Sequence, residues 1–368
     1  MKTPENQTKG KQLLEALLCG LAGGTVFSWI GLPLAWMLGP LTAVILWNLL
    51  TKRTLYWPKS FKNGGQMLLG YSMGLSFTAD SAAQIAGQLP SMTVSTVLMV
   101  VFGLGIAFLA SRMTGVNTPS AVMGTTPGGL SQMTMLSEEI RGADPTIVTF
   151  MQTIRMLAVT FMVPMLTTFA FAGGAGSGIT ASAADAEQTV SGGGLMYLLM
   201  AVIAVFAGTT LALRLRFPTP WILGPLITAA ILTVSGFPAP HLPPLLMVAA
   251  QLLLGVYLGL GIRLDMLKDW RKLLPFSLVS GALMVGFALL LAYILHLIHP
   301  MSMATAFLCI APGGLPEMGV TAHEVGADVS MVAAYQLFRV FFILFLVPLF
   351  LRFAFGRQDT AGKAVESM

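Results

Sequence analysis

Two arginines, Arg155 and Arg339, are the only basic residues that fall inside long apolar segments of the chain. Each lies about ten residues into its segment, which in a helix rising 1.5 Å per residue is about 15 Å deep, near the centre of a bilayer. A guanidinium there costs about 2.5 kcal/mol or more, so it should face a cavity, a ligand or polar partners. Gln152 and Gln336 precede the arginines by three residues and share their helical face. Two interpretations stay open: the arginines contact a ligand, or they support a neighbouring broken helix.

A Pro-Gly-Gly sequence interrupts two other apolar segments, residues 118–140 and 301–325. Proline removes a backbone donor and glycine relaxes the backbone limits, so each helix should break there. The unpaired N–H groups of the following half-helix suit an anion, and paired broken helices point to a transporter binding site. The predicted solute-binding residues are Thr126, Pro127, Gly128, Gly129, Ser131, Gln152, Arg155, Ala311, Pro312, Gly313, Gly314, Glu317, Gln336 and Arg339.

Four acidic residues near the broken segments are candidates for coupling transport to a proton or a sodium ion. Glu139 and Glu324 end these segments, and Asp144 and Asp328 precede the segments that carry the arginines. The aspartates are also typical helix N-caps, which is the favoured interpretation for them. We expect no catalytic residues, metal ligands or cofactor, because the four histidines do not form a ligand cluster and have no histidine counterparts in the other half.

Long apolar segments must position these groups. Of the 368 residues, 55% are hydrophobic and 10% charged, at a mean hydropathy of +0.80. So few charges exclude a water-soluble globule and indicate a polytopic membrane protein. Twelve apolar segments occur, most with the roughly 17–25 residues that cross a bilayer as helix. Both cysteines lie in apolar runs, which excludes a disulfide framework.

The chain contains two copies of one unit. Trp36-Met-Leu-Gly-Pro-Leu41 returns as Trp221-Ile-Leu-Gly-Pro-Leu226, and this offset of 185 residues also relates the two Pro-Gly-Gly sequences. After a single-residue change the offset becomes 184, which pairs Gln152 and Arg155 with Gln336 and Arg339. A register held over so long a stretch indicates an internal duplication. Within each copy, a glycine at every fourth residue (Gly70 and Gly74, then Gly255 and Gly259) forms a flat helix face for packing or for sliding.

Paired Pro-Gly-Gly, Gly-Ala-Asp and Gln-x-x-Arg motifs, at residues 127–155 and 312–339, mark a resemblance. The chain resembles the bacterial integral-membrane AbrB family, whose members also carry an ammonia monooxygenase label. The resemblance covers residues 12–355 and implies a duplicated membrane unit, distantly similar to inverted-repeat secondary transporters. Soluble DNA-binding regulators share the AbrB name, but this chain has no small basic domain of that kind, so no nucleic-acid partner is expected.

Charge distribution predicts the orientation of the halves. If all twelve segments cross the membrane, basic loop residues lie on both sides; if the two Pro-Gly-Gly segments are re-entrant, all 18 lie inside. The expected fold is therefore an all-α polytopic membrane protein with two inverted repeats, each of about five transmembrane helices plus a broken re-entrant or discontinuous helix. The expected units are an N-terminal repeat (1–172), a Gly/Ser/Ala-rich linker (173–194), a C-terminal repeat (195–356) and a cytoplasmic tail (357–368). Both termini should be cytoplasmic, in a bacterial inner membrane.

The favoured function is a secondary transporter that moves a small, anionic organic solute by alternating access. A channel, and a membrane sensor or regulator acting through a partner protein, remain the alternatives, whereas a monooxygenase is disfavoured because its ligand set is missing from the sequence. The expected partners are the solute and the lipid bilayer, and a homodimer is compatible with the sequence.

Overall fold

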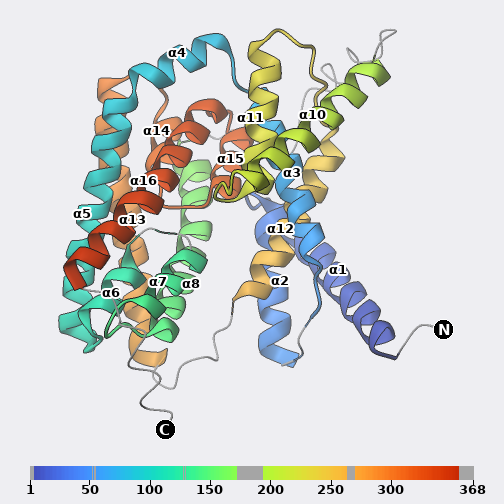
Figure 1. Cartoon of the computed structure of the whole chain (residues 1–368). Coiled ribbons are helices and arrows are strands. Elements are labelled where there is room, and N and C mark those ends of the chain that lie inside the picture. Colours follow the sequence, from blue (N-terminus) through green and yellow to red (C-terminus); the bar gives the residue numbers. More distant parts are fainter. Residues whose placement is uncertain are drawn as a thin grey trace.

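The computed structural model describes residues 4–51, 53, 55–126, 128, 130–171, 194–262 and 270–355. Every regular element among them is a helix, as the sequence predicts (Figure 1). Among the described residues, seven helices are long and apolar enough to cross a membrane, which supports a multi-pass membrane protein: Lys9–Ile30, Leu89–Thr114, Pro145–Phe171, Met196–Arg214, Pro244–Gly261, Leu273–Ile298 and Val329–Phe350.

The described helices are divided here at residue 172, the predicted end of the first half. The first half forms α1 (Pro4–Ile30), α2 (Ala35–Thr51), α3 (Lys59–Leu75), α4 (Ala79–Gly87), α5 (Leu89–Thr114), α6 (Thr118–Thr125), α7 (Leu130–Glu139), α8 (Pro145–Leu166) and the π-helical turn η1 (Thr167–Phe171). The second half forms α10 (Gly194–Arg214), α11 (Pro220–Val234), α12 (Pro244–Gly261), α13 (Trp270–Ile298), α14 (Met303–Ile310), α15 (Leu315–Glu324) and α16 (Val329–Phe355). The expected linker, except Gly194, and the expected tail lie outside the described residues.

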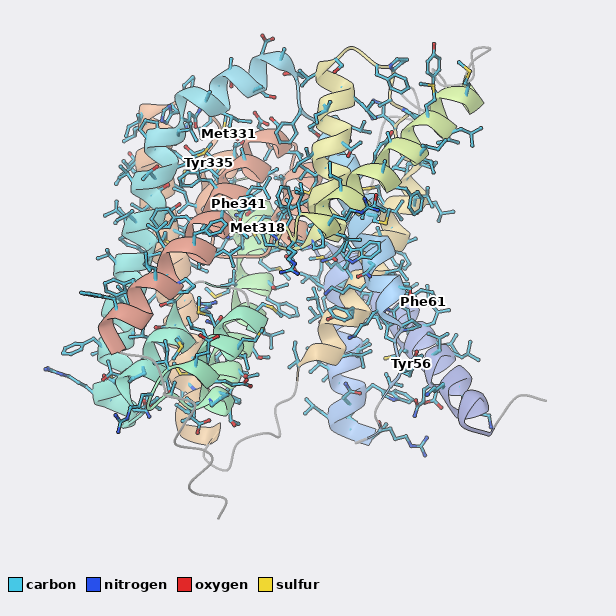
Figure 2. The ribbon with its side chains drawn as sticks, viewed as in Figure 1. Tyr56, Phe61, Met318, Met331, Tyr335 and Phe341 are labelled. Atoms are coloured by element: carbon cyan, nitrogen blue, oxygen red, sulfur yellow. The ribbon has the colours of Figure 1, made fainter. Side chains whose placement is uncertain are left out.

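These helices form two groups (Figure 1). The scaffold bundle consists of α1, α2, α3, α10, α11 and α12, and the hairpin bundle of α5, α6, α7, α8, α13, α14, α15 and α16. Figure 2 shows Met331, Tyr335 and Phe341 among the helices of the hairpin bundle, whereas Tyr56 and Phe61 lie at the scaffold bundle. Each bundle contains helices from both halves of the chain, so neither is formed by one repeat alone.

Glycine faces join the two halves within the scaffold bundle. A Cβ atom on Gly70 of α3 would lie 2.3 Å from the carbonyl oxygen of Ile222 in α11, and one on Gly255 of α12 would lie 2.3 Å from that of Met37 in α2. Because both members of the second contact are the repeat counterparts of the first, the two contacts are reciprocal. The glycine faces therefore touch the backbone of scaffold helices rather than a broken helix (α6 with α7, or α14 with α15). This contact favours the packing interpretation over a sliding face.

Both predicted helix breaks are present. α6 ends at Thr125 and α7 begins at Leu130, while α14 ends at Ile310 and α15 begins at Leu315. We call α6 with α7 hairpin 1, and α14 with α15 hairpin 2. Helix α4 was not predicted; Thr78 starts it with a capping box, in which its side chain accepts from the backbone N–H of Ser81.

Candidate functional site

In hairpin 2, the arginine and glutamine of α16 bind the carbonyl groups where α14 ends. Gln336 Nε2 donates to the oxygens of Leu308 (2.7 Å) and Ala311 (3.1 Å). Arg339 donates through Nη1 to Ile310 (3.1 Å) and Ala311 (2.6 Å), and through Nη2 to Gly313 (2.7 Å). The last carbonyls of a helix have no intrahelical donor, and water is scarce inside a membrane, so these contacts satisfy groups that the break leaves unpaired.

Hairpin 1 repeats this arrangement with α8. Gln152 Nε2 donates to the oxygens of Met123 (2.5 Å) and Thr126 (3.0 Å), and Arg155 Nη1 donates to that of Thr125 (2.7 Å). In each half, Nη2 of the arginine also donates to Oε1 of the glutamine three residues earlier. These contacts favour hairpin support as one role of both arginines.

The arginines have charge and hydrogen-bonding capacity beyond what the hairpin carbonyls use. Both side chains are buried, and Arg155 Nε has no hydrogen-bond partner. Among the side chains that the structure describes, no carboxylate forms an ion pair with either guanidinium. Two uncompensated positive charges therefore lie beside the breaks.

Asp144 and Asp328 cap the helices that carry the arginines. Asp144 Oδ1 accepts from the backbone N–H groups of Thr146 (2.8 Å) and Ile147 (3.4 Å). Asp328 Oδ1 accepts from the N–H of Met331 (3.0 Å) and from the hydroxyl of Ser330 (2.6 Å). These are the contacts of N-cap residues, so the geometry favours capping over ion coupling for both aspartates.

Sequence reasoning missed two hydroxyl residues at these caps. The amide of Asp144 donates to Ser120 Oγ (2.7 Å), and the amide of Asp328 donates to Thr305 Oγ1 (3.1 Å). Each bond ties the start of an arginine-bearing helix to the first half-helix of its hairpin. Ser120 and Thr305 are repeat counterparts, and both carry a hydroxyl group. This match could have identified them from the sequence as residues with a shared role.

A methionine packs against one glycine of each Pro-Gly-Gly sequence. A Cβ on Gly313 would lie 2.3 Å from Met318 Cε, and one on Gly128 would lie 2.2 Å from the Cε of Met133, the counterpart of Met318. Both glycines therefore leave room for a methionine to fold over the break. Pro127 and Gly129 lie outside the described residues, and for Ser131 only the backbone, within α7, is described.

The two hairpins differ in what surrounds them. Val320 of α15 is 2% exposed and packs with scaffold residues including Leu38 and Leu69. Its counterpart Met135 in α7 is 67% exposed, and the buried residues of α7 cluster with hairpin-bundle residues instead. Hairpin 2 is thus docked on the scaffold bundle through a face that hairpin 1 leaves uncovered.

Two further contacts hold hairpin 2 in its docked position. Glu324 Oε2 accepts from the backbone N–H of Leu34 (2.9 Å), in the turn between α1 and α2. A Cβ on Gly319 would lie 2.3 Å from Met73 Cε on α3, so α15 and α3 touch closely. Glu324 therefore stabilises the docked position of hairpin 2. Its repeat counterpart, Glu139, is the last residue of α7 in hairpin 1.

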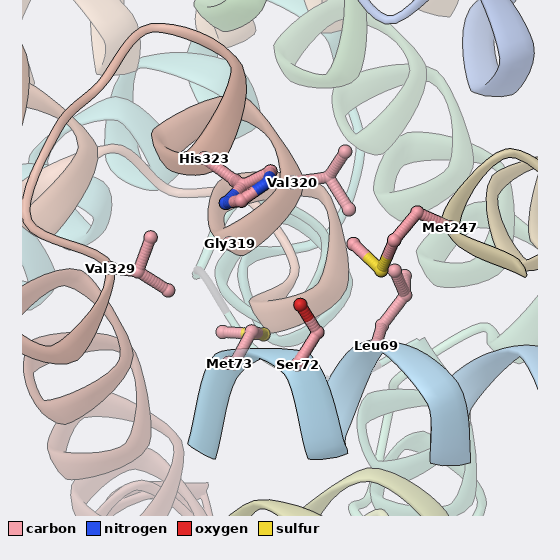
Figure 3. A pocket seen from close by; sticks show the side chains of 8 residues that line it. All are labelled: Leu69, Ser72, Met73, Met247, Gly319, Val320, His323 and Val329. Atoms are coloured by element: carbon pink, nitrogen blue, oxygen red, sulfur yellow. The ribbon is translucent and has the colours of Figure 1, made fainter. Parts of the chain in front are cut away.

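A small cavity marks the interface between hairpin 2 and the scaffold bundle (Figure 3). It has a volume of about 10 Å³ and is lined by Ser72 and Met73 of α3, Met247 of α12, and Val320 and His323 of α15, among others. That volume holds about one water molecule. This cavity is therefore too small for an organic solute.

The chain matches known proteins over most of its length. The family described as "Transition state regulatory protein AbrB" matches residues 36–355. "Uncharacterized protein YhjN" of Bacillus subtilis (strain 168) is 26% identical over 378 aligned positions, covering 96% of this chain and 94% of that protein. "Putative regulator AbrB" of Escherichia coli (strain K12) is 28% identical over 328 positions, covering 88% of this chain and 91% of that protein. With its apolar helices, duplicated motifs and family match over most of its length, the chain belongs to the membrane AbrB family.

Proposed function

We propose that this protein is a secondary transporter that moves a small, anionic organic solute across the bacterial inner membrane by alternating access. Its halves are inverted repeats, each with about five spans and one broken hairpin, and both termini are cytoplasmic. The solute binds between the hairpin breaks, at the N-termini of α7 and α15 and beside Arg155 and Arg339. No catalytic step or cofactor is part of the proposal.

The unequal surroundings of the two hairpins carry this proposal. Val320 and Met135 occupy equivalent positions, yet one is buried against the scaffold and the other is exposed. Because similar polar contacts hold both hairpins, a second state in which hairpin 1 docks and hairpin 2 is released needs few new kinds of contact. In inverted repeats, exchange between such states opens the site alternately to the two sides of the membrane.

The charge of the site supports an anionic solute. Arg155 and Arg339 carry positive charge without an ion-pairing carboxylate among the described side chains, and α15 begins without a side-chain cap. A half-helix N-terminus adds about half a positive charge, which favours an anion. A bound carboxylate or phosphate group compensates these charges.

The orientation of the repeats is tested by labelling single cysteines in a cysteine-free background of intact cells. Residue 177 should react with an impermeant maleimide because the linker lies outside, whereas residue 268 should be protected. Both positions are outside the described residues and lie in predicted loops. Protection at 177 together with labelling at 268 refutes the inverted arrangement.

Transport itself is tested in reconstituted vesicles by screening anionic metabolites under imposed proton and sodium gradients. We expect saturable, gradient-dependent uptake that is lost in Arg339→Gln. Flux that does not saturate points to a channel. The absence of any uptake, with a partner protein captured instead, points to a regulator, as the name of the Escherichia coli relative states for that protein.

Exchange of the hairpins is tested by Val320→Cys and Met135→Cys, each as the single cysteine. A solute that favours one state must deplete the other, so the two reaction rates should change in opposite directions when it binds. Equal rates with and without the solute contradict alternating access.

A further inference from the structure

One acidic residue of hairpin 2 lacks the partners that a buried carboxylate requires. Glu317 lies in the first turn of α15 and is 6% exposed. Its carboxyl group folds back over the break, since a Cβ on Gly314 would lie 2.0 Å from Oε2. It takes a hydrogen bond from its own backbone N–H, but Oε2 has no partner.

The charged and titratable groups on the elements packed against α15 do not compensate this carboxyl. They are Tyr335 and Arg339 on α16 with Asp328 just before it, Arg155 on α8 with Asp144 just before it, Cys309 on α14, Tyr71, Lys59 and Lys62 on α3, and His323 and Glu324 at the far end of α15, with His241 near His323. Both arginines donate to hairpin carbonyls, and the tyrosines donate to Gln88 and Pro240. Among these described side chains, none forms an ion pair with Glu317.

The repeat counterpart of Glu317 is Gln132, which has a similar shape but cannot ionise. The two hairpins therefore differ by one titratable group at matching positions in their first turns. A buried ionised carboxylate that forms no ion pair is costly inside a membrane, whereas a protonated one costs much less. A metal cation such as sodium needs several oxygen ligands, and no cluster of three or more acidic or metal-ligating side chains occurs among the described residues.

We propose that Glu317 binds one proton while hairpin 2 is docked and releases it when the hairpin leaves the scaffold bundle. This proposal rests on the transport function proposed above and names its coupling ion. Ionised Glu317 occupies a backbone N–H at the start of α15, where an anionic solute is expected. Protonation removes the competing negative charge, so the proton and the anion bind together and move in the same direction.

The first experiment detects the proton on Glu317 and does not depend on movement of hairpin 2. Infrared spectra of the protein in lipid should show a protonated carboxyl band that disappears as the pH rises. The band should be missing in Glu317→Gln and should return, with a shifted midpoint, in Glu317→Asp. The matched control is Glu138→Gln, at an exposed position of α7 in hairpin 1, which should keep the band. Identical spectra for the wild type and Glu317→Gln overturn the proposal.

The second experiment links the proton to docking through Val320→Cys as the single cysteine. Low pH favours the protonated, docked state and protects the cysteine, while deprotonation releases the hairpin as the pH rises. Because maleimide reacts with the thiolate, each rate is divided by the rate of a free thiol at the same pH. One linked proton makes this normalised rate rise by up to about tenfold per pH unit. With Glu317→Gln added, the normalised rate should stay low at every pH; an unchanged pH response overturns the proposal. If the infrared band titrates but the cysteine stays protected at every pH, Glu317 does bind a proton. The movement of hairpin 2, and with it the proposed alternating access, is then contradicted.

Discussion

Replacing one glycine on each reciprocal scaffold contact measures how closely the two halves of the chain approach. In Gly70→Ala, the new methyl carbon lies 2.3 Å from the Ile222 oxygen, whereas ordinary contact begins at 3.4 Å. α3 and α11 must therefore separate by about 1 Å, which as overpacking costs about 1–3 kcal/mol. The upper part of this range is expected because the obstructing atom belongs to the backbone. A loss of 2 kcal/mol lowers the folded-to-unfolded ratio by about 30-fold.

Each test variant has a control on its own helix. Among the described residues, apart from chain neighbours and the nearby backbone of the same helix, no atom lies within 4 Å of a Cβ built on Gly64 of α3 or on Gly261 of α12. Alanine there should leave stability unchanged or raise it by up to about 1 kcal/mol, because it reduces the entropy of the unfolded chain. Denaturant titration of purified protein in detergent, followed by circular dichroism, compares the four variants. We expect equal losses for Gly70→Ala and Gly255→Ala; stability equal to that of the controls refutes the close approach.

Two further predictions concern the helices beside the breaks. Arg339→Lys should keep the protein inserted but lower transport at least tenfold, because lysine cannot span the three carbonyls that the guanidinium reaches; uptake equal to the wild type refutes this role. Asp144→Ala should lower the free energy of unfolding by about 1 kcal/mol through loss of the N-cap, while the dependence of uptake on the proton or sodium gradient stays unchanged. A changed ion dependence would instead assign Asp144 to coupling.

Local chemical signals predicted much of the candidate site. Pro-Gly-Gly breaks a helix whatever surrounds it, so the ends of α6 and α14 could be placed from the sequence. The three-residue spacing of Gln336 and Arg339 likewise predicted one polar face. Their carbonyl partners could not be predicted, because the reach of a guanidinium is decided by the packing of α16 on α14.

Tertiary differences between nearly identical hairpins were not predictable from the sequence. Both hairpins contain the same break and bind the same kind of polar pair, yet only hairpin 2 buries its outer face against the scaffold bundle. Sequence periodicity gives no sign of which one docks. Helix α4 was missed for another reason, since the capping box of Thr78 and Ser81 lay in a polar stretch between two apolar segments.

The reciprocal glycine contacts also set the order of events during biosynthesis. Gly70 meets Ile222, about 150 residues later in the chain, and at about 5–20 residues per second the ribosome needs about 8–30 s to make that stretch. During this delay the glycine face of α3 has no partner helix, so the first half cannot complete its own packing. The arrival of α11 completes the packing of α3, and Gly255 of α12, made 33 residues after Ile222, then completes that of α2. Ribosome pausing between residues 75 and 220 should therefore prolong the lifetime of an unpaired first half and expose it to membrane proteases.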